Sequence, residues 1–226
     1  FFYSTVLSES LSPLKKIKPD KVGMDAEKLK LVDQKMEELI KEERLAGGIV
    51  VVARKGKVVH FGTYGKRDRE NNLPVEKDTI FRIYSMTKAI TSVAALMLSE
   101  EGKLNLDDPL SKYFPSLKEM KVLNKGELVE PNREVTVADL LRHTSGLTYG
   151  RTPHKEINQA HKNAGILDRG KKVVPMMNGM GKVPLLFEPG SDWVYGCSTD
   201  VLGGVVEVAS EMSLDQFFRD RIFKPL

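Results

Sequence analysis

The first hundred residues carry a helical pattern followed by an extended one. From residue 25 to residue 43, apolar side chains recur every three or four positions, as they do on one face of an α-helix. These side chains are Leu29, Val32, Met36, Leu39 and Ile40. Asp25 can cap this helix, and Gly47 and Gly48 follow its end. The next run, GIVVVARKGKVVHFGTYG (48–65), has two β-branched stretches around a Lys-Gly pair, which predicts a β-hairpin.

The segment from 85 to 101 is apolar nearly all round, and Gly102 stops it. Its apolar residues include Ala89, Ile90, Val93, Ala94, Leu96 and Met97. A helix that is apolar on every side is expected to be buried. The preceding segment, DRENNLPVEKD (68–78), is expected to be a polar connection.

Hydrophobic patterning is weaker in the rest of the chain, which predicts loops with short helices. We expect loops over 106–118 and much of 148–185, and helices over 137–143 (capped by Thr136), 199–210 and 214–222. Ser213 and Gln216 have the spacing of a capping box for the last of these helices. Two strands alone do not make a stable sheet. We therefore expect further strands from a C-terminal segment that this chain lacks, or from a second chain.

Composition excludes several classes of protein. The chain has 226 residues, a net charge of +4 and one cysteine, Cys197, so it has no internal disulfide. Its longest apolar block, Val93 to Leu98, is far shorter than the roughly 20 residues of a membrane span. No C-x-x-C or H-E-x-x-H spacing suggests a metal site, and no cofactor is expected. The short run Lys15, Lys16 and Lys18 is interpreted as a solvated arm rather than a nucleic-acid or membrane patch.

The N-terminal sequence FFYSTVLSES does not have the features of an intact signal peptide. It lacks a basic start, a long apolar core and an initiator methionine. The compartment is left open between the cytoplasm and a periplasmic or secreted location.

The candidate chemistry is the spacing Ser85-Met-Thr-Lys88 at the head of the apolar helix. Residues three apart lie on one face of a helix, so Ser85 and Lys88 can sit side by side. Serine needs a base to take its proton, and lysine acts as that base only when it is neutral. Burial and the positive end of the helix dipole both favour a depressed pKa for Lys88. The alternative is a helix cap followed by a surface lysine, and the same spacing recurs without support at Ser12 to Lys15.

Three segments together are more specific than the spacing alone. SMTK (85–88), LLRHTSGLTYG (140–150) and FEPGSDWVYGCSTDVLGGVVEVAS (187–210) resemble the serine β-lactamase and penicillin-binding-protein superfamily. The resemblance is greatest to the class C-related carboxylesterases called family VIII esterases, and it runs from about Lys21 to Leu226. It implies an α+β, β-lactamase-like fold with an antiparallel sheet lobe flanked by helices and a mostly helical lobe.

The resemblance also implies the organisation of the chain and the residues of its site. The expected parts are an N-terminal arm (1–20), a sheet lobe (21–103), a mainly helical lobe (104–198) and helices that return to the sheet lobe (199–226). Ser85 is then the acylated nucleophile, Lys88 its proton acceptor and Tyr195 a second proton-transfer group. The expected substrate-binding residues are Tyr84, Trp193 and Cys197. His143 resembles a structural position of the family and is interpreted as a hydrogen-bonded loop histidine.

The sequence departs from the superfamily pattern in two places, and the first departure narrows the expected substrate. The usual Tyr-x-Asn or Ser-x-Asn motif is absent, and Cys197 stands at the position of its asparagine. A thiol is a weak hydrogen-bonding group, which favours esters over amides. The third motif, Lys-Thr-Gly or an equivalent triplet, is also absent.

The expected function is hydrolysis of small carboxylic esters through an acyl-enzyme, with acyl transfer to an alcohol as a compatible reaction. The alternatives are a β-lactamase or D-Ala-D-Ala carboxypeptidase, and a catalytically weak scaffold or binding homologue.

Overall fold

The computed structural model describes residues 15–166, 168, 170 and 172–226. The N-terminal sequence and Ser12 of the second Ser-x-x-Lys spacing therefore lie outside the described residues. The chain divides into two compact units, residues 1–82 with Leu226 and residues 83–225, and each is described by itself. Both helices and sheets are present, as expected for an α+β protein. The grouping into lobes of 21–103 and 104–198 stays a prediction.

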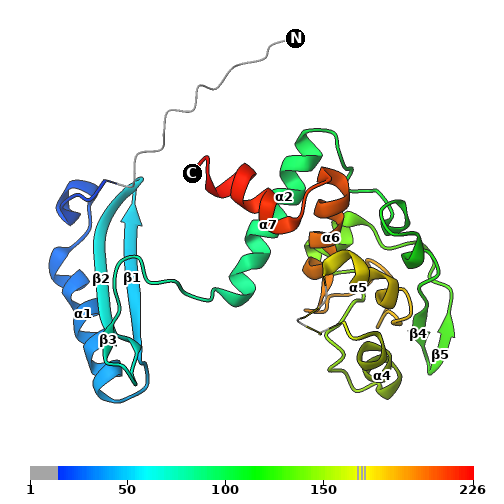
Figure 1. Cartoon of the computed structure of the whole chain (residues 1–226), viewed down its shortest axis with the longest axis horizontal. Helices are drawn as coiled ribbons and strands as arrows, with labels where there is room; N and C mark the ends of the chain where they lie inside the picture. Colours follow the sequence, from blue (N-terminus) through cyan, green and yellow to red (C-terminus); the bar gives the residue numbers. More distant parts are fainter. Residues whose placement is uncertain (1–14, 167, 169, 171) are drawn as a thin grey trace, which may run out of the picture. The chain divides into compact units, whose positions relative to one another are not determined.

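The first unit is a helix packed on an antiparallel sheet. It contains a short 3-10 helix (Pro19–Val22), α1 (Ala26–Lys41), β1 (Gly47–Arg54), β2 (Lys57–Asp68) and β3 (Leu73–Pro74), and the strand order is β1-β2-β3. Figure 1 shows α1 lying along one face of the β1–β2 hairpin. The side chain of Asp25 accepts bonds from the backbone N–H groups of Glu27 and Lys28, which confirms the predicted cap. The hairpin turns at Lys55-Gly56 and is confirmed as well.

Two features of this unit were not predicted. The two-residue strand β3 lies within the segment expected to be a polar connection. The backbone of Ile17 donates to Val58 of β2, and Val58 donates back to Lys15, so this part of the expected arm pairs with the sheet. Strands this short have no periodicity by which a sequence could reveal them.

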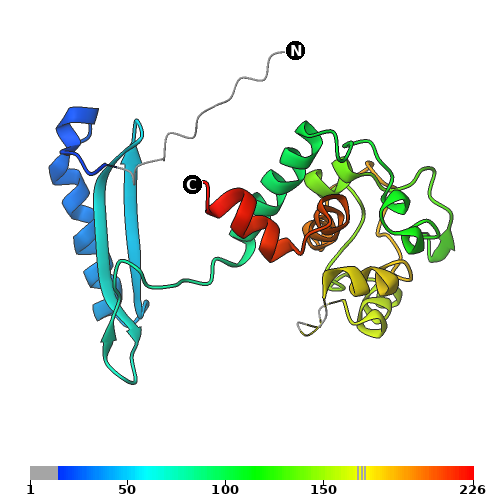
Figure 2. The same cartoon turned by 45° about the horizontal axis from the view of Figure 1, so that its top comes forward.

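The second unit is mainly helical. Its helices are α2 (Thr87–Glu100), α3 (Val137–Arg142), α4 (Lys155–Ala164), α5 (Val173–Met180), α6 (Ser198–Ser210) and α7 (Leu214–Phe217), and a π-helix (Phe218–Phe223) continues α7. Three 3-10 turns (Tyr84–Met86, Leu110–Lys112, Pro115–Leu117) and the two-stranded sheet of β4 (Val122–Asn124) with β5 (Glu127–Val129) complete it. The red π-helix at the end of the chain lies beside α2 in Figure 2.

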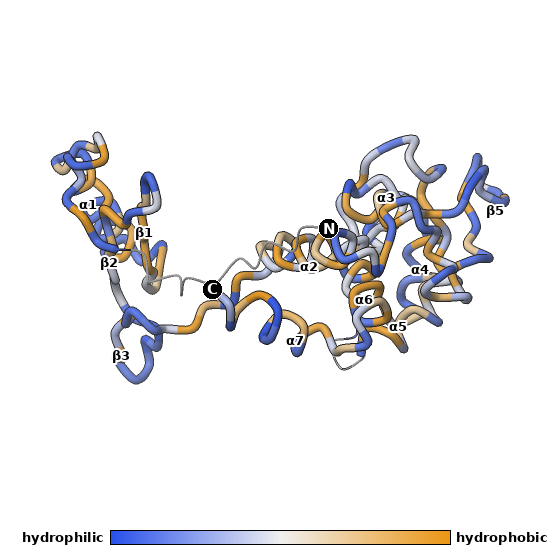
Figure 3. The backbone as a smooth tube through the Cα atoms, turned by 90° about the horizontal axis from the view of Figure 1, so that it is seen from above, coloured by the Kyte–Doolittle hydropathy of each residue, from blue (hydrophilic) through white to orange (hydrophobic). Residues whose placement is uncertain are grey.

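Helix α6 forms the centre of this unit, and α2, α3, α5 and α7 pack against it. Its strongly apolar character is visible in Figure 3. Val201, Leu202, Val205 and Val206 are fully buried, and they belong to the core that also contains Leu98 of α2. Burial of such a face is the main source of stability for a helix of this length.

Two local predictions for this unit are wrong. Only one face of α2 is buried (Thr91, Ala94, Ala95 and Leu98), whereas Val93 is 47% exposed and Leu96 44% exposed. The capping box at Ser213 does not form, because the Ser213 hydroxyl donates to the carboxylate of Asp215 instead. The cap at Thr136 is confirmed. In the part of the chain that the structure describes, no helix is long and apolar enough to cross a membrane.

Candidate active site

Ser85 lies in the 3-10 turn that leads into α2, and it does not act as a helix cap. The N-cap position of α2 is Met86, which makes no side-chain capping bond. Tyr84, directly before Ser85, has a left-handed backbone with φ of 47°, a conformation that is strained for a bulky residue. Strain of this kind is concentrated at functional sites. The interpretation of Ser85 as a simple cap is therefore not supported.

The hydroxyl of Tyr195 contacts Ser85 directly. Its Oη donates to Ser85 Oγ over 2.7 Å, although the two residues are 110 positions apart in the sequence. Both side chains are exposed, so the pair is open to a ligand. If the phenol loses its proton, the same contact reverses and Ser85 becomes the donor.

Lys88 lies one turn after Ser85 and faces two tyrosine rings. Its Nζ is 4.8 Å from the ring centroid of Tyr195 and 5.7 Å from that of Tyr149, which are cation–π distances. The two rings meet edge to face with centroids 5.9 Å apart. The structure thus brings together Ser85, Lys88 and Tyr195 as expected and adds Tyr149, to which the sequence analysis gave no role.

The predicted depression of the Lys88 pKa is wrong. Burial lowers the pKa of Lys88, but hydrogen bonding and charge attraction from the phenolic oxygens of Tyr195 and Tyr149 outweigh it and raise the pKa above its ordinary value. Lys88 is only half-buried, which limits the opposing effect of desolvation. The same interaction with Lys88, helped by Ser85, lowers the pKa of Tyr195. This arrangement favours a charged lysine beside a phenol that gives up its proton more readily.

Two close contacts between neighbouring residues hold Tyr149 next to Tyr195. Cys197 donates its S–H to the carbonyl oxygen of Thr148 over 2.9 Å. Gly196 lies so close to Leu147 that an added Cβ would be 2.0 Å from the Leu147 carbonyl oxygen. Only glycine permits this approach, and the two segments that carry the tyrosines are thereby locked together.

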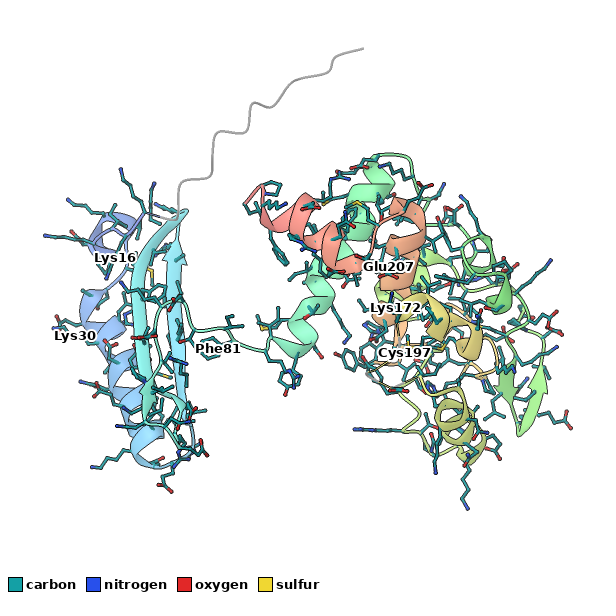
Figure 4. All side chains as sticks on the ribbon, viewed as in Figure 1. Lys16, Lys30, Phe81, Lys172, Cys197 and Glu207 are labelled. Atoms are coloured by element: carbon teal, nitrogen blue, oxygen red, sulfur yellow. The ribbon has the colours of Figure 1, made fainter. Side chains whose placement is uncertain are left out.

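Cys197 is 1% exposed and lies at the start of α6, where Figure 4 labels it. Burial raises the pKa of its thiol well above the ordinary range, so the thiol stays protonated at neutral pH. With its S–H bonded to Thr148, Cys197 belongs to the buried core of this unit. Its expected contact with substrate stays a prediction.

Aromatic side chains surround the hydroxyl groups of Ser85 and Tyr195. Trp193 is 61% exposed and meets the ring of His143 edge-on at 6.3 Å. His143 lies 5.1 Å from the ring of Tyr195, and burial together with the charge of Lys88 lowers the pKa of His143. The Nδ1 atom of His143 is buried without a hydrogen-bond partner among the described residues, which differs from the expected bonded loop histidine. Tyr84 lines the cavity beside Ser85. The roles of Trp193 and Tyr84 in substrate binding stay predictions.

The cavity at Ser85 has a volume of about 250 Å³ and is bordered by α2, α6 and the start of α7. Among the described residues, no three His, Cys, Asp or Glu side chains gather as metal ligands do. The groups that could do chemistry here are therefore hydroxyls, phenols, one ammonium and one carboxylate, that of Asp200.

Known proteins resemble this chain over most of its length. It is 32% identical over 213 residues to esterase EstB of Burkholderia gladioli, a match that covers 92% of this chain and 52% of EstB. The structure of EstCE1, a hydrolase with promiscuous acyltransferase activity, superposes with a TM-score of 0.77 at 31% identity, covering 87% of this chain and 51% of that one. Simvastatin synthase (LovD) from Aspergillus terreus gives a TM-score of 0.74 at 27% identity, covering 89% and 53%.

The chain spans about half the length of the relatives that it matches. The family model described as Beta-lactamase matches residues 32–226, which cover most of the first compact unit and all of the second. The expected α+β, β-lactamase-like fold is thereby confirmed. The chain belongs to the β-lactamase family.

Proposed function

We propose that the protein is a serine hydrolase that cleaves small carboxylic esters through an acyl-enzyme on Ser85. The observation that carries this proposal is the 2.7 Å contact of Tyr195 Oη with Ser85 Oγ beside the charged group of Lys88. The printed names of EstB, an esterase, and EstCE1, a hydrolase with acyltransferase activity, support the same class of reaction.

The reaction begins when the phenolate of Tyr195 takes the proton of Ser85 while Ser85 Oγ attacks the ester carbonyl. Lys88 stays charged and stabilises the phenolate before this transfer. The backbone N–H of Ser85, in the 3-10 turn that leads into α2, is the candidate donor to the oxyanion that forms. Tyr195 then gives its proton to the departing alcohol, which leaves an acyl-Ser85 ester and a regenerated phenolate.

Deacylation repeats these steps with water as the attacking group. Tyr195 takes the proton of the water as its oxygen attacks the acyl carbonyl, and then gives that proton to Ser85 Oγ as the acid is released. A second alcohol in place of water would give a new ester. The acyltransferases among the relatives make this second reaction a reasonable companion activity. The buried Cys197 at the place of the usual asparagine favours ester substrates over β-lactams and peptides.

Reaction of the natural protein with a fluorophosphonate, followed by mass spectrometry of its peptides, tests the nucleophile. We expect one adduct on Ser85 that is lost in Ser85→Ala and kept in Ser99→Ala, a matched control at the far end of α2. Nitrophenyl butyrate and a chromogenic cephalosporin assayed side by side test the substrate class. Fast cephalosporin turnover without ester cleavage would indicate a β-lactamase, and absence of any Ser85 adduct would indicate a scaffold.

A further inference from the structure

A carboxylate borders the cavity that contains the proposed nucleophile. Asp200 lies in the first turn of α6 and lines the same cavity as Ser85, Lys88 and Thr91. Among the described residues that line this cavity, it is the one acidic side chain. The site chemistry derived above does not use it.

Asp200 is connected to the proton-transfer groups through Tyr149. The hydroxyl of Tyr149 points at Asp200 Oδ2 over 3.5 Å, the outer limit of a hydrogen bond. The ring of the same Tyr149 lies 5.7 Å from Lys88 Nζ and packs edge to face on Tyr195. Tyr149 therefore approaches Asp200 with its hydroxyl, and its ring lies next to Lys88 and Tyr195.

A simpler explanation is that Asp200 only interacts with the dipole of α6, because acidic residues are favoured in the first turn of a helix. That explanation requires neither a cavity wall nor a neighbouring cation. Asp200 lines the cavity, and the positive charge of Lys88 attracts its carboxylate. Protein atoms crowd this carboxyl group although the residue as a whole is exposed, and this desolvation raises the pKa of Asp200.

We infer that Asp200 is a positioning residue of this site: it holds the Tyr149 hydroxyl and supplies the countercharge that keeps the Lys88 ammonium between the two tyrosine rings. The inference rests on the proposed function of Ser85, Lys88 and Tyr195. The groups that face Asp200 are Lys88 from α2, His143 from the end of α3, Tyr149 from the following loop, Tyr195 and Cys197 from the segment before α6, and the apolar Leu214 from α7.

Removing the charge of Asp200 should shift the pKa of Tyr195 in a defined direction. The charge of Asp200 raises the pKa of Tyr195, against the larger lowering by Lys88. Asp200→Asn therefore lowers the pKa of Tyr195 further, and the reaction of Ser85 retains its rate to lower pH. At the same time the rate on the high-pH plateau falls, about 10- to 100-fold, because Lys88 and Tyr149 lose a fixed position.

The test measures the rate of fluorophosphonate labelling of Ser85 against pH in the natural protein, with Asp107→Asn as the exposed, charge-matched control. We expect Asp200→Asn to lower the plateau and to move the acid-side fall to lower pH, and Asp107→Asn to change neither. In a Tyr149→Phe background, Asp200→Asn should lower the plateau labelling rate less than it does in the wild type, because the Tyr149 hydroxyl that contacts Asp200 is already absent.

A lower plateau with an unmoved pH dependence would indicate a purely structural role and overturn the inference, as would wild-type behaviour of Asp200→Asn. Ultraviolet difference titration of tyrosinate provides a second readout that does not need acylation. If wild-type Ser85 is not labelled, the proposed function fails, and the titration alone decides whether Asp200 acts on the tyrosines. An unchanged tyrosinate titration in Asp200→Asn would then contradict the inference.

Discussion

At the scale of single residues, the direction of proton transfer depends on Lys88 and Tyr195 together. The charge and hydrogen bonding of Lys88 lower the pKa of Tyr195, so we expect activity to rise with pH through that lowered value. Lys88→Met removes the cation and lets the pKa return toward its ordinary value of about 10. The fall in kcat/KM for nitrophenyl acetate on the acid side should therefore move to higher pH. Movement of the Lys88→Met profile to lower pH would contradict this assignment.

Tyr195→Phe removes the proposed proton-transfer group itself. It should therefore lower kcat/KM about 10²- to 10⁴-fold instead of moving the pH profile.

The sequence predicted which residues meet at the site but not how they share a proton. The closeness of Ser85 and Lys88 follows from helix geometry, and the role of Tyr195, 110 positions after Ser85, follows from the family resemblance. The pKa of Lys88 depends on how near two phenolic oxygens lie, which the burial of its own helix does not reveal. Tyr149 was missed although the segment that contains it carried the resemblance, because one aromatic residue in a loop has no periodic signal.

At the scale of elements, the start of α3 is fixed by one buried carboxylate. Asp139 is 3% exposed and pairs with both guanidinium nitrogens of Arg133 at 2.5 and 3.0 Å. It also accepts from the backbone and hydroxyl of Thr136 and from the hydroxyl of Thr144. The helix that it anchors leads into the loop that carries Tyr149, so this cluster supports the site from a distance.

Removing this carboxylate should destabilise the protein. Burial raises the pKa of Asp139, but the bonds from Arg133, Thr136 and Thr144 outweigh burial and lower the pKa below its ordinary value. Its contribution to stability is therefore present above about pH 4 and is lost as the pH falls further. We expect Asp139→Asn to reduce the free energy of unfolding in urea by about 3 kcal/mol at neutral pH. The difference should shrink in acid, and an equal loss at both pH values would show that packing alone is responsible.

Elements whose hydrophobic pattern extends over many residues were predictable. Strands of two or three residues, and the burial of only one face of a helix, were not. The helix capped by Asp25 and the hairpin around Lys55-Gly56 follow from periodicity and turn chemistry. Strands of two or three residues, such as β3 and β4, are set by pairing partners that no local pattern identifies. Helix α2 has the composition of a buried helix, yet its exposed face depends on which elements pack against it, and that is a property of the tertiary structure.

At the scale of the whole molecule, the boundary between the two compact units falls between Arg82 and Ile83. The chain before this boundary has no helix or strand from residue 75 to residue 82, and Ile80 and Phe81 are 97% and 45% exposed. Proteases cut segments that can extend without breaking packed structure. Within the described part of the chain, we expect brief chymotrypsin treatment to cut first after Phe81, which mass spectrometry of the two fragments would show. Phe81→Ser should slow this cut while leaving thermal unfolding unchanged. A first cut inside α6 or the β1–β2 hairpin would instead show that the weakest part of the chain lies within a unit.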